Sequence, residues 1–498
     1  MTSTIGATEI GMLSPQLAIV VLGLVVLTLD LLTKRQSVVA VVGLIGLAAP
    51  LACTILLVTG VFPNKGTAFF GMLVVDSYGI FFDFLFIIIA AFVLLVGYDY
   101  ATRYLRASIG EYYGLILLSA GGMMLMGSSR ELITIYIALE LTSIPLYVLS
   151  GLSRADGRSP EAAIKYVLLG AMSSAILLYG MALLYGATGS TDLGEIAKAA
   201  AGGLQSGNLL LLIADVFIFA GFGFKVSAVP FHMWAPDIYE GSPTPSTLFF
   251  TVGSKAAGFA ALLRVFVAGG LVATSHSYLW VMVGVVAALT MTVGNVVALR
   301  QTNIKRMMAY SGIGQAGYLL LGVAALMIHN TPAGQVAVLA FILVYVVTNL
   351  GAFSGIIAMA DATGNENITD FDGFGQRSPR TATGLAICML SLAGWPPTAG
   401  FFSKLFIFYV AWQAGAGLPW LVVLALVNST ISMVYYVNIV WRMFVAKPAK
   451  QDRLSTPLTV STSVWVTTAA VIALTIAFGW LLTQTQLGAT SLFATVHP

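Results

Sequence analysis

Two lysines lie inside consecutive, strongly hydrophobic stretches of the sequence. Lys225 precedes a proline-rich polar turn, and Lys255 follows it, about ten residues after Pro245. If these stretches cross a membrane, Lys255 is roughly 15 Å along its helix, where its ammonium cannot easily reach water. Ionisable groups in hydrocarbon are costly and are functional candidates by default. A lysine held there could gain or lose a proton when a charged partner moves.

A buried carboxylate and a further lysine extend this series. Glu140 is about eight residues into its hydrophobic run, or roughly 12 Å deep, where it needs a cation or a proton. We expect Lys225 to be that cation. Lys404 follows a proline-containing break in another run. Spaced along the membrane midplane, these four residues predict a proton relay. The alternatives are a neutral structural glutamate and lysines that snorkel from helix ends.

Five other polar residues are candidates for proton access or for loop roles. His232 could relay protons to the buried lysines because imidazole titrates near neutrality, although a histidine in such a turn is as often structural. Lys165 and Lys305 begin hydrophobic spans. The concentration of basic residues in the adjoining loops is sufficient to explain them, yet hydrated cavities could place them farther inside the membrane. Asp237 and Glu240 are loop carboxylates that are either solvated or part of the site.

The composition identifies an all-α, polytopic membrane protein. The chain has 498 residues, of which 58% are hydrophobic and 9% charged, whereas soluble domains have about 25% charged residues. The apolar runs are long and do not alternate, which predicts helices rather than barrel strands. The net charge of +3, without a basic patch, gives no indication of nucleic-acid binding. Cys53 and Cys388 lie in apolar runs without metal-ligand spacing, so we expect no metal, iron–sulfur or haem site on this chain.

The hydrophobic runs predict about fourteen transmembrane helices and no soluble domain. Their expected ranges are 15–33, 38–60, 77–97, 111–128, 131–152, 162–187, 208–229, 245–268, 278–299, 306–328, 334–359, 382–413 (interrupted), 418–445 and 462–484. Helices 7 and 12 are expected to be broken, since each contains a proline that removes a backbone donor. The carbonyls freed at such a break can solvate an ammonium group.

Basic residues are concentrated in the loops on one side of the predicted bundle. The loops that follow odd-numbered spans contain 16 of the 23 lysines and arginines, against three in the even-numbered loops and termini. The positive-inside rule therefore places the odd loops in the cytoplasm and both termini on the outer, periplasmic side. Arg264, within span 8 and near its outer end, is expected to snorkel. Asp83 also lies within an apolar run.

The middle of the chain is predicted to contain two inverted five-helix repeats, spans 4–8 and 9–13. The two halves begin on opposite sides of the membrane, and each carries a proline-interrupted span in the corresponding position. Such paired interruptions indicate a transport site at the repeat interface. The expected divisions are an N-terminal three-helix segment, two antiporter-like repeats, and a C-terminal helix and tail, over 1–110, 111–270, 271–446 and 447–498.

The sequence contains four long and specific segments: FKVSAVPFHMWAPDIYEGSPTP, EAAIKYVLLGAMSSAILLYGMALLYG, QTNIKRMMAYSGIGQAGYLLLG and LSLAGWPPTAGFFSKLFIF. Together they resemble the antiporter-like, proton-translocating subunits of bacterial respiratory complex I, the type I NADH:quinone oxidoreductase. The similarity extends from about residue 15 to about residue 484. Among these subunits, lysine at position 404 favours the N or L type over the M type, and a chain that stops soon after span 14 favours the N type.

The resemblance carries several implications for fold, site and partners. It implies a fold of fourteen helices with broken helices 7 and 12, and a relay of Glu140, Lys225, Lys255 and Lys404. It also implies a location in the bacterial inner membrane, in contact with lipid, with an M-type antiporter-like subunit on one side and a small K-type subunit on the other. NADH, flavin, iron–sulfur clusters and quinone are then expected on other subunits, with no redox centre on this chain.

Two other functions are compatible with the same residues. An Mrp-type cation/proton antiporter subunit would transport sodium without an electron donor. A structural membrane spacer would use its buried charges only to specify packing.

Overall fold

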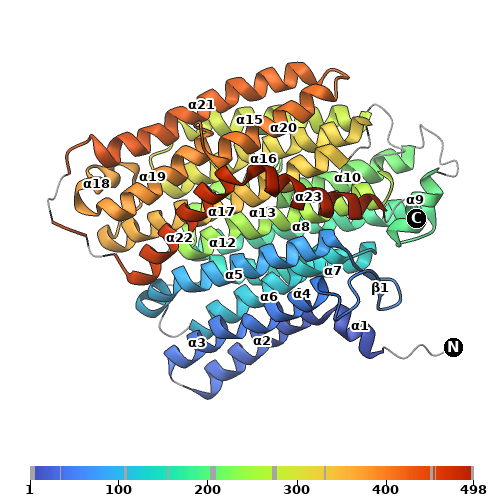
Figure 1. Cartoon of the computed structure of the whole chain (residues 1–498), viewed down its shortest axis with the longest axis horizontal. Coiled ribbons are helices and arrows are strands. Elements are labelled where there is room, and N and C mark those ends of the chain that lie inside the picture. The colour runs from blue at the N-terminus through green and yellow to red at the C-terminus, as the bar shows by residue number, and fades with distance from the viewer. Residues whose placement is uncertain are drawn as a thin grey trace.

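The computed structural model describes residues 6–33, 35–105, 109–153, 156–201, 209–271, 278–329, 332–448, 452–454 and 456–494. Its long helices run roughly along the long axis of the molecule, so the connecting segments collect at its two ends (Figure 1). Twelve helical segments of this described chain are long and apolar enough to cross a membrane. The chain is therefore a mostly helical integral membrane protein. Four of the basic loop residues counted for orientation lie outside the described residues, namely Lys34, Arg106, Arg154 and Lys450.

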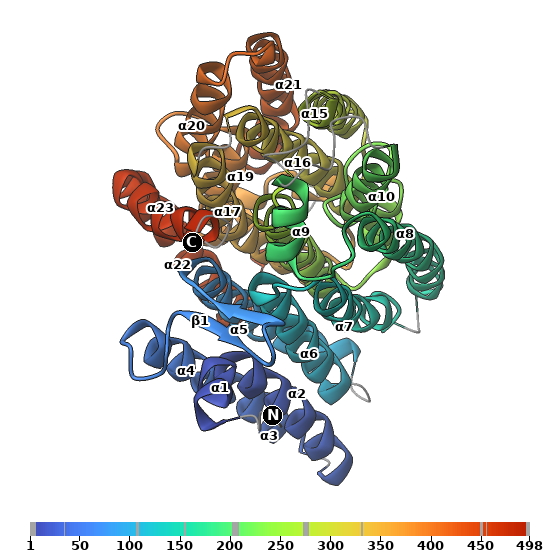
Figure 2. The ribbon, with the colours of Figure 1, turned by 90° about the vertical axis from the view of Figure 1, so that its right-hand side faces the viewer.

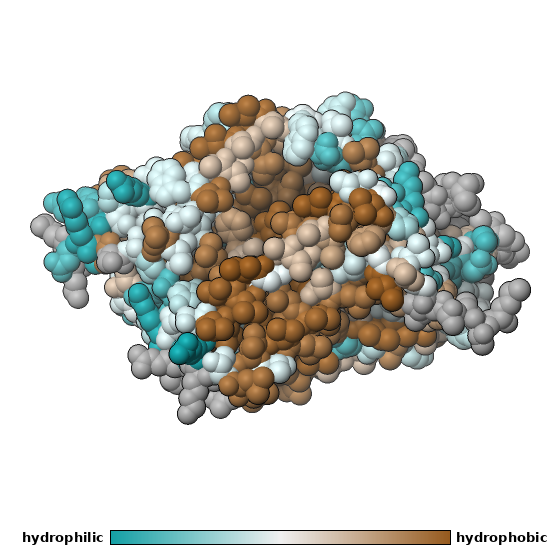
Figure 3. Space-filling view, turned by 60° about the horizontal axis from the view of Figure 1, so that its bottom comes forward, coloured by the Kyte–Doolittle hydropathy of each residue, from teal (hydrophilic) through white to brown (hydrophobic). Residues whose placement is uncertain are grey.

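The surface has the polarity that a bilayer requires. Figure 3 shows a broad hydrophobic area across the middle of one face and hydrophilic residues toward the two ends of the molecule. Large aliphatic side chains are exposed along the spans, for example Val21, Ile137, Leu168 and Val423. Because helices satisfy their own backbone hydrogen bonds, such faces can lie against lipid or against another membrane subunit.

The N-terminal part combines helices with a short hairpin. Its elements are α1 (Ala7–Met12), α2 (Ser14–Leu32), α3 (Gln36–Gly46), α4 (Ala48–Val58), β1 (Gly66–Ala68), β2 (Leu73–Val75) and α5 (Ser77–Tyr104). The two strands pair antiparallel and lie at the same end of the molecule as α1 (Figures 1 and 2). The hairpin was not predicted, because strands of three residues are too short to show alternation.

The next part contains the first broken helix and an irregular span. Its elements are α6 (Ile109–Ser128), α7 (Leu132–Ser150), α8 (Arg158–Thr188), α9 (Leu193–Ala201), α10 (Leu209–Lys225), α11 (Trp234–Gly241), α12 (Thr244–Phe249), η1 (Phe250–Ser254), α13 (Lys255–Leu263) and η2 (Arg264–Ala268). The last four of these elements form one continuous span, Thr244–Ala268. Within it, η1 and η2 are π-helical, a conformation that is frequent at functional sites.

The remaining part contains the second broken helix. Its elements are α15 (Tyr278–Ala298), α16 (Ile304–His329), α17 (Pro332–Thr363), the 3₁₀ helix η3 (Ile368–Phe371), α18 (Phe374–Arg377), α19 (Pro379–Ala393), α20 (Ala399–Gln413), α21 (Leu418–Phe444), α22 (Leu458–Ile476) and α23 (Phe478–Ala494). The last predicted span, 462–484, is divided between α22 and α23, which meet at Ala477. Both helices pack against α17.

Two of the predicted spans are interrupted in the structure. α10 ends at Lys225 after 17 residues, and a break at 394–398 divides the span 382–413 into α19 and α20, with 15 residues each. At 1.5 Å per residue, a 15-residue helix such as α19 or α20 covers roughly 22 Å, less than the hydrocarbon core of about 30 Å. Each interruption lies where the prolines predicted it, and each is followed by a further helix.

Arg264 does not snorkel, contrary to the sequence-based expectation. It is 1% exposed, and its Nη1 lies 2.5 Å from Asp76 Oδ2. Its Nε donates to the carbonyl of Gly127 at 3.1 Å, and its guanidinium stacks 4.7 Å from the centre of the Tyr78 ring. Asp76 also caps α5 by accepting a hydrogen bond from the backbone of Gly79. Because the partner carboxylate is 188 residues away in the chain, the sequence offered no sign of this buried pair.

We predict that Arg264→Met strongly destabilises the protein. The substitution leaves Asp76 as a buried carboxylate without its cation, a loss of about 3–5 kcal/mol. Arg264→Met combined with Asp76→Asn should recover part of that loss. The matched control is Arg130→Met, because the Arg130–Asp192 pair is about one-third exposed and is expected to contribute about 1 kcal/mol or less. Thermal unfolding of the purified protein in detergent measures the difference, and equal effects of Arg264→Met and Arg130→Met would contradict the buried pair.

Candidate functional site

Lys225 is the last residue of α10 and is 5% exposed. Its Nζ donates a hydrogen bond to Ser143 Oγ and lies 5.9 Å from the centre of the Tyr147 ring. Ser143 and Tyr147 lie on one face of α7, so a single helix offers the ammonium both a hydroxyl and an aromatic face. The carbonyl of Phe224, at the end of α10, instead accepts a hydrogen bond from the Trp234 indole at 2.8 Å.

Glu140 does not form a direct ion pair with Lys225 in the described residues. It is half-buried on α7, and its Oε1 accepts a hydrogen bond from Ser174 Oγ on α8. Because Glu140 precedes Ser143 by three residues, the two side chains lie on the same side of α7. The carboxylate and the ammonium therefore occupy neighbouring positions, but a separate hydroxyl satisfies each of them. The predicted salt bridge is absent from this conformation.

Lys255 begins α13, directly after the π-helical segment η1. It is 2% exposed, its Nζ donates to the carbonyl of Gly312 on α16, and it lies 5.5 Å from the centre of the Tyr345 ring. The glycine makes this approach possible, since a Cβ at position 312 would lie 2.8 Å from Nζ. A Cβ at Gly258, one turn further along α13, would lie 3.1 Å from Cβ of Lys225. The helices that carry the two lysines are therefore in close contact.

Lys404 lies on α20 beside the second break and is 4% exposed. Its Nζ donates to the carbonyls of Leu392 and Ala393 at 2.9 and 3.0 Å, and it lies 5.2 Å from the centre of the Tyr318 ring. These carbonyls are at the end of α19, where the interruption leaves them without helical partners. The expectation that a broken helix solvates an ammonium therefore holds at Lys404, while a serine takes this role at Lys225.

A line of polar groups joins the surroundings of Lys255 to Lys404. Gln315, on α16, donates to the same Leu392 carbonyl that Lys404 binds, at 3.0 Å, and lies 3.5 Å from the hydroxyl of Tyr436. A cavity of about 10 Å³ lined by Gln315, Tyr345 and Lys404 has room for about one water molecule. Gln315 was not singled out in the sequence, where nothing distinguishes it from other polar residues of a span.

Three of the polar candidates, Lys165, Asp237 and Glu240, belong to a network of ion pairs at one end of the bundle. Asp237, on α11, lies 3.0 Å from Lys165 and 2.7 Å from Arg306, which also lies 3.0 Å from Glu240. Lys165 additionally pairs with Glu161 at 2.8 Å. An open cavity of about 180 Å³ is lined by these side chains. The two carboxylates of uncertain role are thus joined to charged partners.

Lys305 differs from Lys165 because it is buried, with only 3% of its surface exposed. Its Nζ lies 2.7 Å from Glu366 and donates to the carbonyl of Ser242 at 2.8 Å. Glu366 lines a second open cavity, of about 340 Å³, together with Thr244. Glu366 was missed in the sequence because it lies in a polar loop more than sixty residues from Lys305. The role of Lys305 in proton access stays a prediction.

His232 lies between α10 and α11, next to Met233, whose side chain is 73% exposed. The imidazole is half-buried, and its Nδ1 has no hydrogen-bond partner among the described residues. It makes no described contact with Lys225. Its role in proton access stays a prediction.

The charges around Asp237 control its protonation. Burial opposes ionisation of this carboxyl, but the hydrogen bonds from Lys165 and Arg306 outweigh burial and hold its pKa below the usual value of 3.8. Asp237 is therefore ionised throughout the physiological range and serves as a fixed charge. A proton carrier would need a pKa closer to neutrality.

The same arrangement of helices occurs in known proteins. The sequence profile of the family "NADH:quinone oxidoreductase/Mrp antiporter, TM" matches residues 129–432, which include all four residues of the buried series. A protein of Symbiobacterium thermophilum named NADH-quinone oxidoreductase subunit N 2 is 47% identical over 414 residues, covering 82% of this chain and 80% of the relative. The chain belongs to this family.

Solved structures extend the similarity over nearly the whole chain. A chain of respiratory complex I from Thermus thermophilus with bound Aureothin is 33% identical, covers 94% of this chain and 98% of that chain, and has a TM-score of 0.79. A chain of the Mrp complex from Dietzia sp. DQ12-45-1b has a TM-score of 0.86 with 97% of both chains covered. Because that chain is only 20% identical, its likeness shows the antiporter-like fold alone.

We predict that the stabilisation from Asp237 is independent of pH near neutrality. A carboxyl whose pKa is lowered on folding adds stability above its unfolded pKa and loses it only as pH falls through the folded pKa. Asp237→Asn should therefore lower the melting temperature by the same small amount at about pH 5 and about pH 8, and the exposed pairs imply about 1 kcal/mol or less. Glu195→Gln, at an exposed pair with Lys198, is the control. A difference that disappears at about pH 5 would mark Asp237 as a titrating proton carrier.

Proposed function

We propose that the chain is the N-type proton-translocating subunit in the membrane arm of an NADH:quinone oxidoreductase. The buried lysine series supports this function most directly. Lys225, Lys255 and Lys404 each lie at a helix interruption or beside a π-helical segment, and each lies over a tyrosine ring. The Symbiobacterium relative is named as subunit N of this enzyme.

The first step of the proposed mechanism is a change in the pairing of Glu140 and Lys225. In this conformation Ser174 holds the carboxylate and Ser143 holds the ammonium. Electron transfer elsewhere in the complex would bring the two charges together or separate them. Two unit charges about 4 Å apart interact by about 4 kcal/mol at an effective dielectric of 20. Since one pKa unit corresponds to about 1.4 kcal/mol, pairing is sufficient to change the protonation of Lys225.

The second step passes the charge imbalance from Lys225 to Lys255 and then to Lys404. The close contact of α10 with α13 supports coupling between the first two lysines. Gln315 and the water-sized cavity beside Lys404 supply hydrogen-bonding groups between the last two. A proton then leaves toward the outer side, and another is taken up from the cytoplasm.

Proton uptake begins at the ion pairs of Lys165 and of Lys305, and Asp237 serves as a fixed charge beside Lys165. The first open cavity is lined by Lys165 and Asp237, and the second by Glu366, the partner of Lys305, so both ion pairs are open to water. Two buried hydroxyls, Ser242 Oγ and Ser246 Oγ, have no hydrogen-bond partner among the described residues. Such groups are normally satisfied by water, so they suit a hydrated path along α12 toward Lys255.

The assembly follows from the same proposal. NADH, flavin, iron–sulfur clusters and quinone belong to other subunits, and this chain contributes no redox centre. An M-type antiporter-like subunit lies on one side and a small K-type subunit on the other, in a bacterial inner membrane with both termini of this chain on the outer side. The fold comprises fourteen transmembrane helices in which 111–270 and 271–446 are inverted repeats.

We predict that Lys225→Ala and Lys255→Ala each lower the ratio of protons pumped to electrons transferred. Each substitution removes an ammonium that the relay needs, and no other buried lysine can replace it. The measurement uses the complete complex in proteoliposomes, with proton uptake and NADH oxidation followed together. Lys198→Ala removes an exposed lysine and serves as the control. A Lys225→Ala complex that pumps at the full ratio would falsify the relay.

The same preparation separates the alternative functions. Sodium transport that needs no electron donor would identify an Mrp-type antiporter subunit instead. Normal pumping after all four charges of the series are neutralised would identify a structural spacer.

A second prediction concerns Gln315. Gln315→Leu removes the amide that shares a carbonyl with Lys404, a hydrogen bond of about 0.5–1.5 kcal/mol, so we expect up to about a tenfold lower pumping rate. Gln335→Leu is a matched control, because Gln335 is fully buried on α17 and its amide has no partner among the described residues. Equal rates for the two variants would remove Gln315 from the path.

A further inference from the structure

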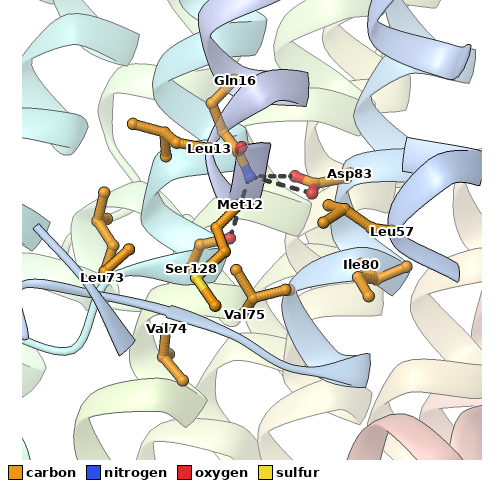
Figure 4. A pocket seen from close by; sticks show the side chains of 12 residues that line it. Met12, Leu13, Gln16, Leu57, Leu73, Val74, Val75, Ile80, Asp83 and Ser128 are labelled. Carbon is orange, nitrogen blue, oxygen red and sulfur yellow. Dashed lines mark hydrogen bonds between the residues drawn. The ribbon is translucent and has the colours of Figure 1, made fainter. Parts of the chain in front are cut away.

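A second buried carboxylate lies outside the lysine series, in the N-terminal helices. Asp83, on α5, is 1% exposed. The amide of Gln16, on α2, lies 3.0 Å from both carboxylate oxygens and 3.3 Å from Ser128 Oγ on α6 (Figure 4). No lysine or arginine of the described chain forms an ion pair with Asp83. An unpaired carboxylate at such a position is costly in a membrane protein unless it takes up a proton.

The hydrogen bonds of this group are incomplete in a way that points to a ligand. One NH₂ group with two hydrogens faces three acceptors, two on Asp83 and one on Ser128. The other end of the same amide, Gln16 Oε1, is buried without a hydrogen-bond partner in the described residues, although Gln16 is only 3% exposed. The cluster therefore has more acceptors than protons. One added proton on Asp83 would correct that imbalance.

A small cavity adjoins these groups. It has a volume of about 10 Å³, enough for about one water molecule, and Gln16, Asp83 and Ser128 supply its polar lining. Its other lining residues are apolar or contribute backbone, among them Leu57 and Ile80 (Figure 4). Leu73 and Val74 of the hairpin also line it, at the end of the molecule that the basic loops predict to face outward. The cavity thus lies between the hairpin and the buried carboxylate.

The charges that face Asp83 come from one neighbouring ion pair. Asp76 caps the first turn of α5 through Gly79, which also lines the cavity, and Arg264 of η2 neutralises Asp76. Gln16 and Ser128, from α2 and α6, carry no charge. With Asp83 ionised, the three charged residues sum to −1, and with Asp83 protonated they sum to zero. The same span carries Arg264 and Lys255, so the cluster adjoins the helix of the central lysine.

We propose that Asp83 is a further proton-binding site, with Gln16 and one cavity water completing its hydrogen bonds. Ionised Asp83 accepts from Gln16 Nε2, and the water donates to Gln16 Oε1. When Asp83 takes up a proton from the outer side, the amide turns over, its oxygen accepts the new O–H, and its nitrogen donates to the water. Water can accept as well as donate, so the Gln16 amide is paired at both ends in each state. A role in proton release rests on the proposed function, whereas proton binding itself does not.

The experiment is an infrared pH titration of the purified complex that contains this chain. We expect a titrating carbonyl band of a protonated carboxylic acid in the unmodified complex, and its loss in Asp83→Asn. Asp30→Asn, which also removes one carboxyl from the N-terminal helices, should retain the band. Identical titrations of the unmodified and Asp83→Asn complexes would overturn the proposal.

Two further arms keep the result decisive. If the Asp83→Asn complex does not assemble, the Gln16→Leu variant is used in its place. Gln16→Leu should change the frequency and the titration midpoint of the band. An unchanged band in this variant would contradict the site. Loss of the band on adding sodium, but not potassium at equal ionic strength, would show a sodium site instead. Lys225→Ala should leave the band in place, so a failure of the relay and a failure of the Asp83 site are separate outcomes.

Discussion

An ammonium group inside hydrocarbon must be given polar partners by the protein itself, and the fold depends on how this requirement is met. Each lysine of the series lies at the end of a helix, beside a break or directly after a π-helical segment. Lys404 uses the carbonyls of a broken helix, and Lys255 follows a π-helical segment and binds a carbonyl of the neighbouring α16. Lys225 ends its helix and relies on a serine and a tyrosine of α7. The irregular parts of the helices therefore hold the lysines of the candidate site.

Among the described residues, four buried cations lie over a tyrosine ring, namely Lys225, Lys255, Arg264 and Lys404. A ring face stabilises positive charge without fixing a hydrogen bond, so the ammonium can turn between acceptors. Arg264 contrasts with the lysines, because its guanidinium does not lose its proton and its carboxylate partner is 2.5 Å away. A tyrosine ring thus accompanies both the permanently charged Arg264 and the three lysines. The groups that accept their hydrogen bonds distinguish the two kinds of site.

Composition and hydrophobic runs were sufficient to predict a helical membrane protein and where two spans are interrupted, because bilayer thickness and proline geometry act locally. Contacts between helices that are far apart in the sequence could not be predicted in this way. Arg264 was expected to snorkel, Asp76 did not stand out and Glu366 looked like any loop carboxylate, yet each is a buried or half-buried ion-pair partner. Glu140 shows the opposite error, since its predicted partner is close in the fold but a serine intervenes for each group. Residue type identified the candidates, and only packing assigned their partners.

The separation of Glu140 from Lys225 bears on how a charge relay can be directional. If the two charges were permanently paired, each would hold the other ionised and neither could respond to an event outside the chain. Serine hydroxyls that satisfy both groups separately make the unpaired arrangement stable enough to persist, so pairing becomes a second state rather than the only one. Glu140 is half-buried, whereas Lys225 is only 5% exposed. Under the proposed function, an adjacent subunit would therefore act on the carboxylate first, and the charge would then move inward toward Lys255 and Lys404.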